Sequence, residues 1–452
     1  MRKFLGTAAL CVLLGIGAAG AQETEQTGTL ELDLAGALEI ALSENPTVKV
    51  ADMEVERIDY VRRETLGGHL PSLSATGQYN FSIVKQEMAK GMSFGADMSA
   101  MGNADLSVPL VVPAVYAALR MNRTQQLLAV EQARSSRIEL MAGVRKAFYQ
   151  VMLLERSLAV LTESEATVAA TVENTRTMFE AGLASEYDLL TAQVQLSNLK
   201  PSLISTENGI VVAKQMLKML LGLPESVDIS LRGSLEDSLD GNVPGMPAVP
   251  DAYGLVEGNS EVRQLDHQQA LVRGQIRLAN AARLPTLAAY GTLSLSGQDK
   301  TMGFGVTPEG EMGVVSTNKW WWQKPTNAGL SISVPIFSGL RNVSKVKQLR
   351  NQVAQIELQK NYLREAKALE ARTAANNIMS AYQSMVANRK TVEQAEKAYS
   401  ISRTRFDAGA GTMLEVNQAQ LAVTQSRLNH TQAICDMLIA GAEYDRIVGT
   451  EK

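Results

Sequence analysis

Two hydrophobic patterns divide the chain between strands and helices. Residues 72–83 alternate almost strictly, and segment 328–336 does the same, while segments 105–112 and 286–296 alternate more weakly, with Tyr290 out of phase. A period of two residues predicts four β-strands, each with one apolar and one polar face. In residues 72–83 the apolar face carries Leu73, Ala75, Gly77, Tyr79, Phe81 and Ile83.

The helical pattern is longer and more regular. Residues 115–179 and 339–406 contain no proline, so each predicts one unbroken helix, about 100 Å long at 1.5 Å per residue. Shorter helices are expected near 47–69 and 186–221, and stacked end to end they match the long helix beside them. A coiled-coil-like apolar seam marks the second long helix. Its members are Leu349, Val353, Ile356, Leu363, Ala366 and Leu369.

Several segments recur between the two halves of the chain. Segment 179–188 returns at 406–415, an offset of 227 residues, and Leu70-Pro71 returns as Leu284-Pro285. The repeated order of helix, strand, loop, strand, very long helix, turn and helix predicts two structural repeats, at 22–224 and 251–449. Residues 225–250 between them are rich in glycine and proline, which predicts an irregular connector, and residues 450–452 form a tail.

The first 21 residues have the pattern of a secretory signal peptide. Arg2 and Lys3 precede an apolar run, and small residues lead to an A-x-A cleavage site at Ala19-Gly20-Ala21. Cleavage leaves 41 basic against 47 acidic residues, a net charge of −6 that does not favour nucleic acid. Cys435 is then the one cysteine of the mature chain, so no intramolecular disulfide is expected.

The mature sequence has no apolar stretch of the roughly 18 residues that a transmembrane helix needs. A closed β-barrel is the other way to span a bilayer. The four alternating segments have the pattern of transmembrane strands, although a half-buried sheet in a soluble protein has the same period. Trp320, Trp321 and Trp322 directly precede the fourth strand, where a barrel carries its interfacial aromatic residues.

Four strands cannot close a membrane barrel, because the smallest known examples have about eight. Closure therefore requires strands from neighbouring subunits, and a ring of subunits also gives the long helices partners. The sequence predicts an exported, mainly α-helical chain with a membrane β-barrel portion that several copies build together.

Two long matching segments carry a resemblance to a known family. They are Phe-Glu-Ala-Gly-Leu-Ala-Ser-Glu-Tyr-Asp-Leu-Leu-Thr-Ala-Gln at 179–193 and Phe-Asp-Ala-Gly-Ala-Gly-Thr-Met-Leu-Glu-Val-Asn-Gln-Ala-Gln at 406–420. The opening at 34–42 with Asn45-Pro46, and Val-Pro-Ile-Phe-Ser-Gly at 334–339, are also typical. In this order the chain resembles the TolC-like outer membrane efflux proteins over essentially its whole mature length.

This resemblance implies a homotrimer in the outer membrane. Its 12-stranded barrel continues into an α-helical tunnel through the periplasm. The resemblance further implies docking to a periplasmic adaptor protein and to an inner-membrane pump or ABC transporter, in a tripartite efflux or type I secretion system. No cofactor is implied, and the barrel is expected to contact outer-membrane lipid.

The resemblance also assigns site residues at the two helix–turn–helix ends. In the family these ends form the periplasmic tip, where the adaptor binds. The corresponding residues here are Gly182 with Leu183 and Gly409 with Ala410. A glycine has its own reason there, because a left-handed residue ends a helix best when it is glycine.

Two acidic residues stand at the family's pore constriction. Asp188 and Glu415 lie six residues beyond the tip glycines, although acids in a first helical turn also favour the N-terminal end of the helix dipole. Gln418 replaces the next acidic position of the family, and Gly411 replaces the arginine that faces Asp188.

Other classes of protein fit the sequence less well. The three histidines, His69, His267 and His430, are scattered, and no nucleophile elbow, phosphate loop or zinc spacing is present, so no catalysis is expected. A periplasmic structural coiled coil or adaptor explains the helices but not the strands or the tryptophans.

Four methionines lie between the first two strands, in a glycine-rich stretch interpreted as an external loop. They are Met88, Met92, Met98 and Met101. Thioethers suit Cu(I) or Ag(I), whereas methionine is also an ordinary filler of a flexible hydrophobic loop. No cysteine or histidine accompanies them, so a tight metal site is not expected.

Overall fold

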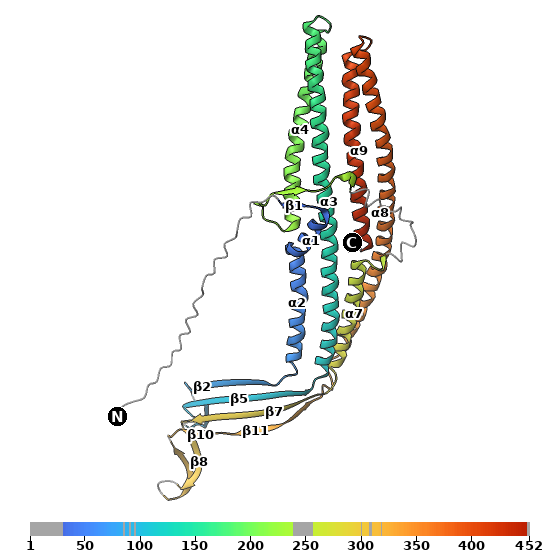
Figure 1. Cartoon of the computed structure of the whole chain (residues 1–452). Helices are drawn as coiled ribbons and strands as arrows, with labels where there is room; N and C mark the ends of the chain where they lie inside the picture. Colours follow the sequence, from blue (N-terminus) through green and yellow to red (C-terminus); the bar gives the residue numbers. More distant parts are fainter. Residues whose placement is uncertain are drawn as a thin grey trace, which may run out of the picture.

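The molecule is a tall wall of helices with a β-sheet projecting from one end (Figure 1). This computed structural model describes residues 30–84, 86–89, 92–94, 96–237, 256–299, 301–306, 310–317 and 319–449. The predicted signal peptide, residues 238–250 of the connector and the tail at 450–452 lie outside the described residues.

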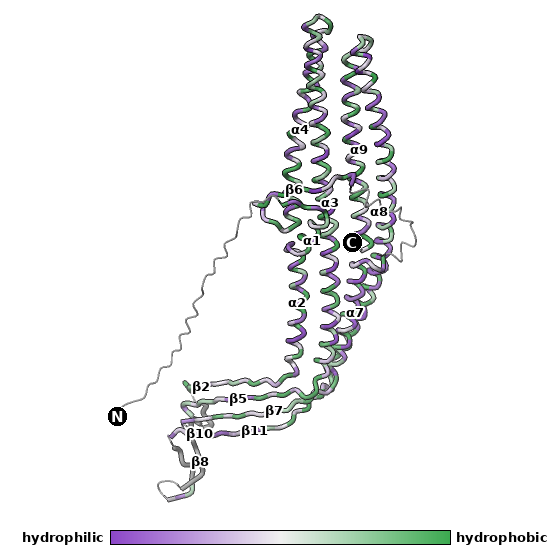
Figure 2. Tube along the Cα trace, viewed as in Figure 1, coloured by the Kyte–Doolittle hydropathy of each residue, from purple (hydrophilic) through white to green (hydrophobic). Residues whose placement is uncertain are grey.

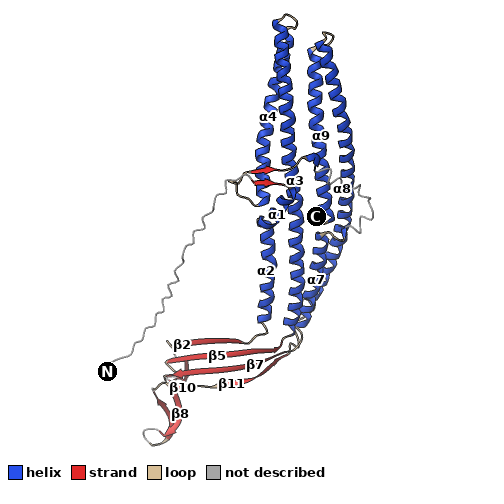
Figure 3. Cartoon of the chain, in the orientation of Figure 1, coloured by secondary structure: helices blue, strands red, loops and turns tan. Residues whose placement is uncertain are grey.

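Two helical hairpins form most of the wall, and shorter helices continue it towards the sheet (Figure 3). The helices are α1 (Leu34–Glu44), α2 (Pro46–Gly67), α3 (Pro113–Glu180), α4 (Glu186–Leu221), α7 (Ser260–Ala281), α8 (Arg341–Asp407) and α9 (Met413–Val448). Both long helices, α3 and α8, are confirmed as unbroken and end within two residues of the predicted bounds. Among the described residues, no helix is long and apolar enough to cross a membrane. Hydrophobic and hydrophilic stretches are mixed along the helices (Figure 2).

The short helices are stacked end to end, as predicted, and one asparagine joins each stack. The side-chain oxygen of Asn45 caps α2, and its amide donates to the carbonyl of Leu220, at the end of α4, over 2.7 Å. Asn259 caps α7 in the same way and donates to the carbonyl of Ile447, at the end of α9, over 2.8 Å. We call these two junctions the joints. In both halves the stack consists of a 22-residue and a 36-residue helix.

The main hydrophobic core lies at the height of the joints, where α1, α3, α4 and α9 meet. Phe148 and Val144 of α3 pack there with Leu217 of α4 and Ile434 of α9, all nearly inaccessible to solvent. Strand β1 (Leu30–Leu32) pairs in parallel with β6 (Ile229–Leu231) beside this core. The connector was predicted to be irregular from residue 225, so β6 corrects that prediction, because burial of Ile229 stabilises a pairing too short to show a pattern.

The seam predicted for α8 is correct only in its first part. Leu349 and Ile356 are buried against α7, with Val353 partly buried beside them. Ala366 and Leu369 are exposed instead, and Leu369 keeps 66% of its surface accessible.

Two lysines take the place of the missing apolar seam residues. Lys360 binds Asp266 of α7 over 2.9 Å, and Lys367 binds Glu261 of α7 over 2.7 Å and Glu370 over 3.0 Å. Burial alone would lower the pKa of the Lys367 ammonium, but the hydrogen bonds that it donates to both carboxylates outweigh this effect and raise that pKa. The aliphatic stems fill the seam while the charged ends reach the acids.

The main sheet contains the four predicted strands. They are β2 (Ser72–Phe81), β5 (Met98–Val111), β7 (Thr286–Gln298) and β11 (Thr326–Ser333), paired antiparallel in the order β2, β5, β7, β11. Strand β10 (Trp321–Gln323) pairs with the end of β7 that lies farthest from the helices. Two hairpins, β3 (Gln86–Ala89) with β4 (Met92–Phe94) and β8 (Thr301–Val306) with β9 (Met312–Thr317), extend beyond the sheet. Within the described residues the sheet is open, with β2 at one edge and β11, followed along β7 by the short β10, at the other.

Candidate channel surfaces

The two faces of the sheet differ in polarity across all four strands. The ladder pairs Thr76 with Asn103, and Asn103 with Ser294, so polar residues lie beside polar residues from strand to strand. The opposite face carries large apolar side chains that the single chain leaves exposed, among them Leu73 at 75% and Ile332 at 70%. Such a sheet separates an apolar environment from an aqueous one.

Tyr290, which broke the predicted alternation, belongs to the polar face. It pairs with Ser107 of β5 and with Gly329 of β11. A Cβ atom at Gly329 would lie 3.0 Å from the Tyr290 hydroxyl oxygen, so the glycine leaves room for the ring. On the same face, the Thr292 hydroxyl donates to the Asp105 carboxylate over 2.8 Å.

The three tryptophans lie at the end of the sheet farthest from the helices. Trp322 pairs with Gly297 and stacks on Trp320, with ring centroids 5.6 Å apart. Alternation places Trp320 and Trp322 on the apolar face and Trp321 on the polar face. All three are at least 40% exposed, and their membrane-interface role remains a prediction.

The methionines do not share one loop as the sequence indicated. Met98 and Met101 lie within β5, paired with Phe81 and Gln78 of β2. Their separation of three residues puts their side chains on opposite faces. The ladder to β2 extends β5 seven residues beyond the predicted start, through small and polar residues of low strand propensity. Met88 and Met92 belong to the β3–β4 hairpin.

The two turns at the far end of the wall contain the predicted tip glycines. Gly182 and Gly409 have φ of 73° and 70°, and a Cβ atom at either position would have no neighbour within 4 Å. Only the left-handed backbone therefore demands glycine here. Leu183 beside the first glycine is 75% exposed, an apolar side chain at the extreme tip of the molecule.

Asp188 and Glu415 both begin the helix that follows a tip turn. Asp188 forms a capping box with Ser185: its backbone N–H donates to the Ser185 hydroxyl, and its carboxylate accepts from the Ser185 N–H. The Glu415 N–H donates to the Thr412 hydroxyl over 3.3 Å. Both residues therefore take part in the N-terminal capping of their helices. The pore role of the two carboxylates remains a prediction.

The two acids differ in their charged neighbours. Glu415 lies 3.5 Å from the guanidinium of Arg405, which also donates to the carbonyl of Ala410. Asp188 has no basic partner among the described residues. Sequence reasoning missed Arg405, because the contact crosses a turn between residues ten positions apart and no periodicity marks it.

An arginine between the joints and the tips connects the two hairpins. Arg427 of α9 contacts Glu163 of α3 at 2.8 Å and Glu396 of α8 at 2.6 Å. The hydrogen bonds that the Arg427 guanidinium donates to these carboxylates raise its pKa. Beside it, the seam between α3 and α9 is polar, with the Ser164 and Thr424 hydroxyls 2.8 Å apart.

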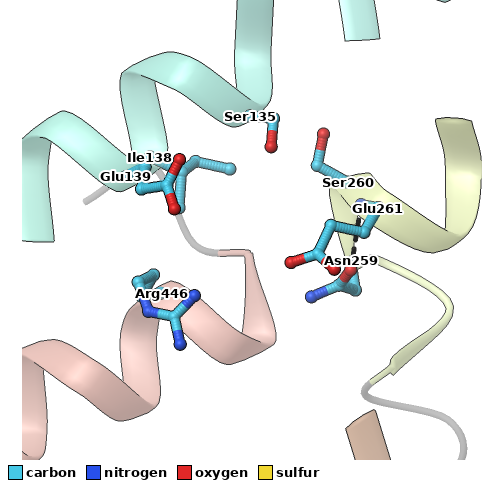
Figure 4. A pocket seen from close by; sticks show the side chains of 7 residues that line it. All are labelled: Ser135, Ile138, Glu139, Asn259, Ser260, Glu261 and Arg446. Carbon is cyan, nitrogen blue, oxygen red and sulfur yellow. Dashed lines mark hydrogen bonds between the residues drawn. The ribbon is translucent and has the colours of Figure 1, made fainter. Parts of the chain in front are cut away.

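A small pocket lies beside the second joint (Figure 4). Side chains from α3, α7 and α9 line it, and its volume of about 20 Å³ accommodates one water molecule. Arg446 points towards it and forms ion pairs with Glu370 and Glu443. The pocket thus belongs to the packing of the joint. In the described part of the chain, no three His, Cys, Asp or Glu side chains gather to hold a metal ion.

This architecture is shared with outer-membrane channels. A crystal structure of CusC, described as revealing transmembrane channel formation, matches with a TM-score of 0.75 and 16% identity over 93% of each chain. The chain therefore has the fold of this channel protein.

Sequence comparison gives the family. The model of the family described as outer membrane efflux protein matches residues 37–223 and 253–450, and the chain belongs to this family. The outer membrane protein TolC of Vibrio cholerae serotype O1 is 21% identical, over 84% of this chain and 82% of TolC. The cation efflux system protein CusC of Escherichia coli O157:H7 is 21% identical, over 86% of this chain and 79% of CusC.

Family membership confirms several predictions. The protein is an outer-membrane exit duct of tripartite efflux systems with a long periplasmic part, and its relatives are channel proteins rather than enzymes. The resemblance stated from the segments at 179–193 and 406–420 is confirmed in the same way.

Proposed function

We propose that three copies of this chain form a continuous duct, in which the four main strands of each copy supply one third of a 12-stranded barrel. The open sheet carries this proposal. Its edges, β2 and β11, have unpaired backbone groups, and its apolar face is exposed in the single chain. In a lipid environment every backbone N–H and C=O must be paired. Pairing of β2 with the β11 of a neighbour satisfies both edges at once.

The helical wall then forms the periplasmic tunnel. The trimer has the tips with Gly182 and Gly409 at its inner end, where the adaptor docks and an inner-membrane transporter supplies the energy. Asp188 and Glu415 form rings of carboxylates at the narrow end, because threefold symmetry repeats each residue around one axis. At the end of the barrel farthest from the helices, the side chains of Trp320 and Trp322 face the lipid.

Cell fractionation followed by conductance measurement tests this function. We expect the full-length protein to sediment with the outer membrane, to run as a trimer under mild detergent conditions and to form ion-conducting channels in planar bilayers. Crosslinking in membranes should capture a periplasmic adaptor. Recovery as a soluble monomer without conductance would exclude a duct.

A further inference from the structure

In α3, α7 and α8 the helical turns nearest the sheet carry a concentration of unpaired positive charge, whereas the end of α2 mixes both signs, with Arg62 and Arg63 paired to Asp59. We call the unpaired set the collar. It consists of Arg120, Arg123, Arg273, Arg277, Arg283, Arg341, Lys345, Lys347 and Arg350, all of them exposed. None of the nine has an acidic partner in the described part of the chain. No Asp or Glu occurs in residues 113–130, 267–285 or 341–356, although the whole chain has more acidic than basic residues.

The collar lies next to apolar surface. Between the sheet and the helices the chain exposes Leu70, Leu284, Ile336 and Phe337, with 94% of Ile336 and 81% of Phe337 accessible. Beyond them comes the exposed apolar face of the sheet. Arg283 is three residues from β7, and Arg341 is eight residues from β11, so the sequence of surfaces is apolar sheet, apolar junction, then cations.

We propose that the collar binds the phosphate groups of anionic phospholipids in the leaflet that adjoins the helices. The proposal rests on the proposed function, since the sheet must lie in the membrane for the collar to meet headgroups. Arginine and lysine near a membrane surface each contribute about 1 kcal/mol to attraction of anionic lipid, and guanidinium groups also bind phosphate through paired hydrogen bonds. Long basic side chains reach the interface while their stems cover apolar surface.

Solubility of the helices in water does not explain why the collar carries only positive charge. Exposed helices elsewhere in the wall mix both signs of charge, as in the exposed pairs Arg176–Glu173 and Arg389–Glu393. A surface that faces only water gains nothing from a single sign, because like charges repel. A surface with basic and no acidic residues is favoured where it contacts an anionic surface, because acidic residues would be repelled there.

Native mass spectrometry of the detergent-solubilised trimer tests the proposal. Wild type is compared with the quadruple variant Arg277→Gln, Arg283→Gln, Arg341→Gln, Lys345→Gln, using phosphatidylglycerol and phosphatidylcholine as probes. We expect wild type to bind phosphatidylglycerol preferentially. The variant should bind it about fivefold more weakly for each cation that contacts a headgroup, with phosphatidylcholine binding unchanged. The matched control is Lys200→Gln, Lys390→Gln, Lys397→Gln, Arg403→Gln, which removes four exposed cations far from the sheet and should behave as wild type.

Channel measurements on the same proteins separate the outcomes. Equal phosphatidylglycerol binding by wild type and the collar variant, with trimers and conductance intact, overturns the inference and leaves the duct standing. A change in anion selectivity without any change in lipid binding places the collar in the lumen and also overturns it. Absence of trimers and conductance in wild type removes the proposed function itself.

Discussion

At the scale of single residues, the two tips are similar in form and different in charge. Each turn leads into a helix with acidic residues in its first turn, Glu186 and Asp188 in α4 and Glu415 in α9. Of these three, only Glu415 has a guanidinium nearby among the described residues, that of Arg405 at 3.5 Å. In the proposed trimer each of these residues forms a ring of three carboxylates. Because Arg405 partly neutralises the Glu415 ring, the Asp188 ring should contribute more than the Glu415 ring to the negative field at the narrow end.

The double substitution Asp188→Asn with Glu415→Gln tests this field. Rings of carboxylates attract cations, so the variant should lose cation selectivity and divalent-cation block in planar bilayers. Expression and the barrel should be unaffected. Arg405→Gln serves as the opposite control, because it frees Glu415 and should increase cation selectivity. Purely structural carboxylates would instead give a stability loss of about 0.3–1 kcal/mol with unaltered single-channel properties.

The sequence predicted the positions of the two acids and the tip glycines, but it did not predict which basic residues form ion pairs between helices. Arg405, Arg427 and Lys367 look like solvent-facing charges in a helical pattern, because periodicity treats every lysine or arginine as polar surface. Each is nevertheless fixed by acids on another helix. Such contacts depend on how helices are set beside each other, which no single-helix pattern contains.

At the scale of elements, the long helices and strands followed from pattern alone. The absence of proline predicted α3 and α8 as unbroken helices, and strict alternation predicted β2. The β1–β6 pair was missed because three residues show no period. The start of β5 was missed because Met98 to Asn103 are held by the ladder to β2 rather than by their own propensity.

The tip turns are the elements most sensitive to a single change. Gly182→Val or Gly409→Val forces a branched side chain to φ near +70°, at about 1–2 kcal/mol. We expect adaptor crosslinking to decrease while trimer yield stays the same. Gly143→Val is the matched control, because Gly143 also has open space around it but lies inside α3. Equal adaptor crosslinking by all three variants would show that the conformation of the tip turns is not needed for docking.

At the scale of the whole molecule, the open sheet determines what must surround it. A neighbour's β11 beside β2 predicts disulfides between subunits. Ser331→Cys is combined in turn with cysteine at Ser72, Ser74, Thr76 or Gln78, which share its polar face. At least one pair should give an oxidation-dependent trimer on denaturing gels.

Two features make this crosslinking result clear. Burial raises the pKa of the native Cys435 thiol to about 12, so it stays protonated and unreactive. Leu73→Cys with Ser331→Cys is the control, because its side chain projects from the opposite face of β2. A sheet that closes within one chain would give crosslinked monomers and no trimer.

The joints have a consequence for how such a wall changes length in evolution. At the height of Asn45 and Asn259 one short helix of each stack ends and the other begins. The joints thus divide the wall along its length into two parts, which we call storeys. The storey beside the sheet is set by the 22-residue helices and the storey towards the tips by the 36-residue helices. An insertion in α3 on the sheet side of the joints must be matched in α2, α7 and α8, and one on the tip side in α4, α8 and α9, because these helices pack side by side. Each storey can therefore lengthen on its own, and the duct can be fitted to a deeper periplasm without altering its barrel or its tips.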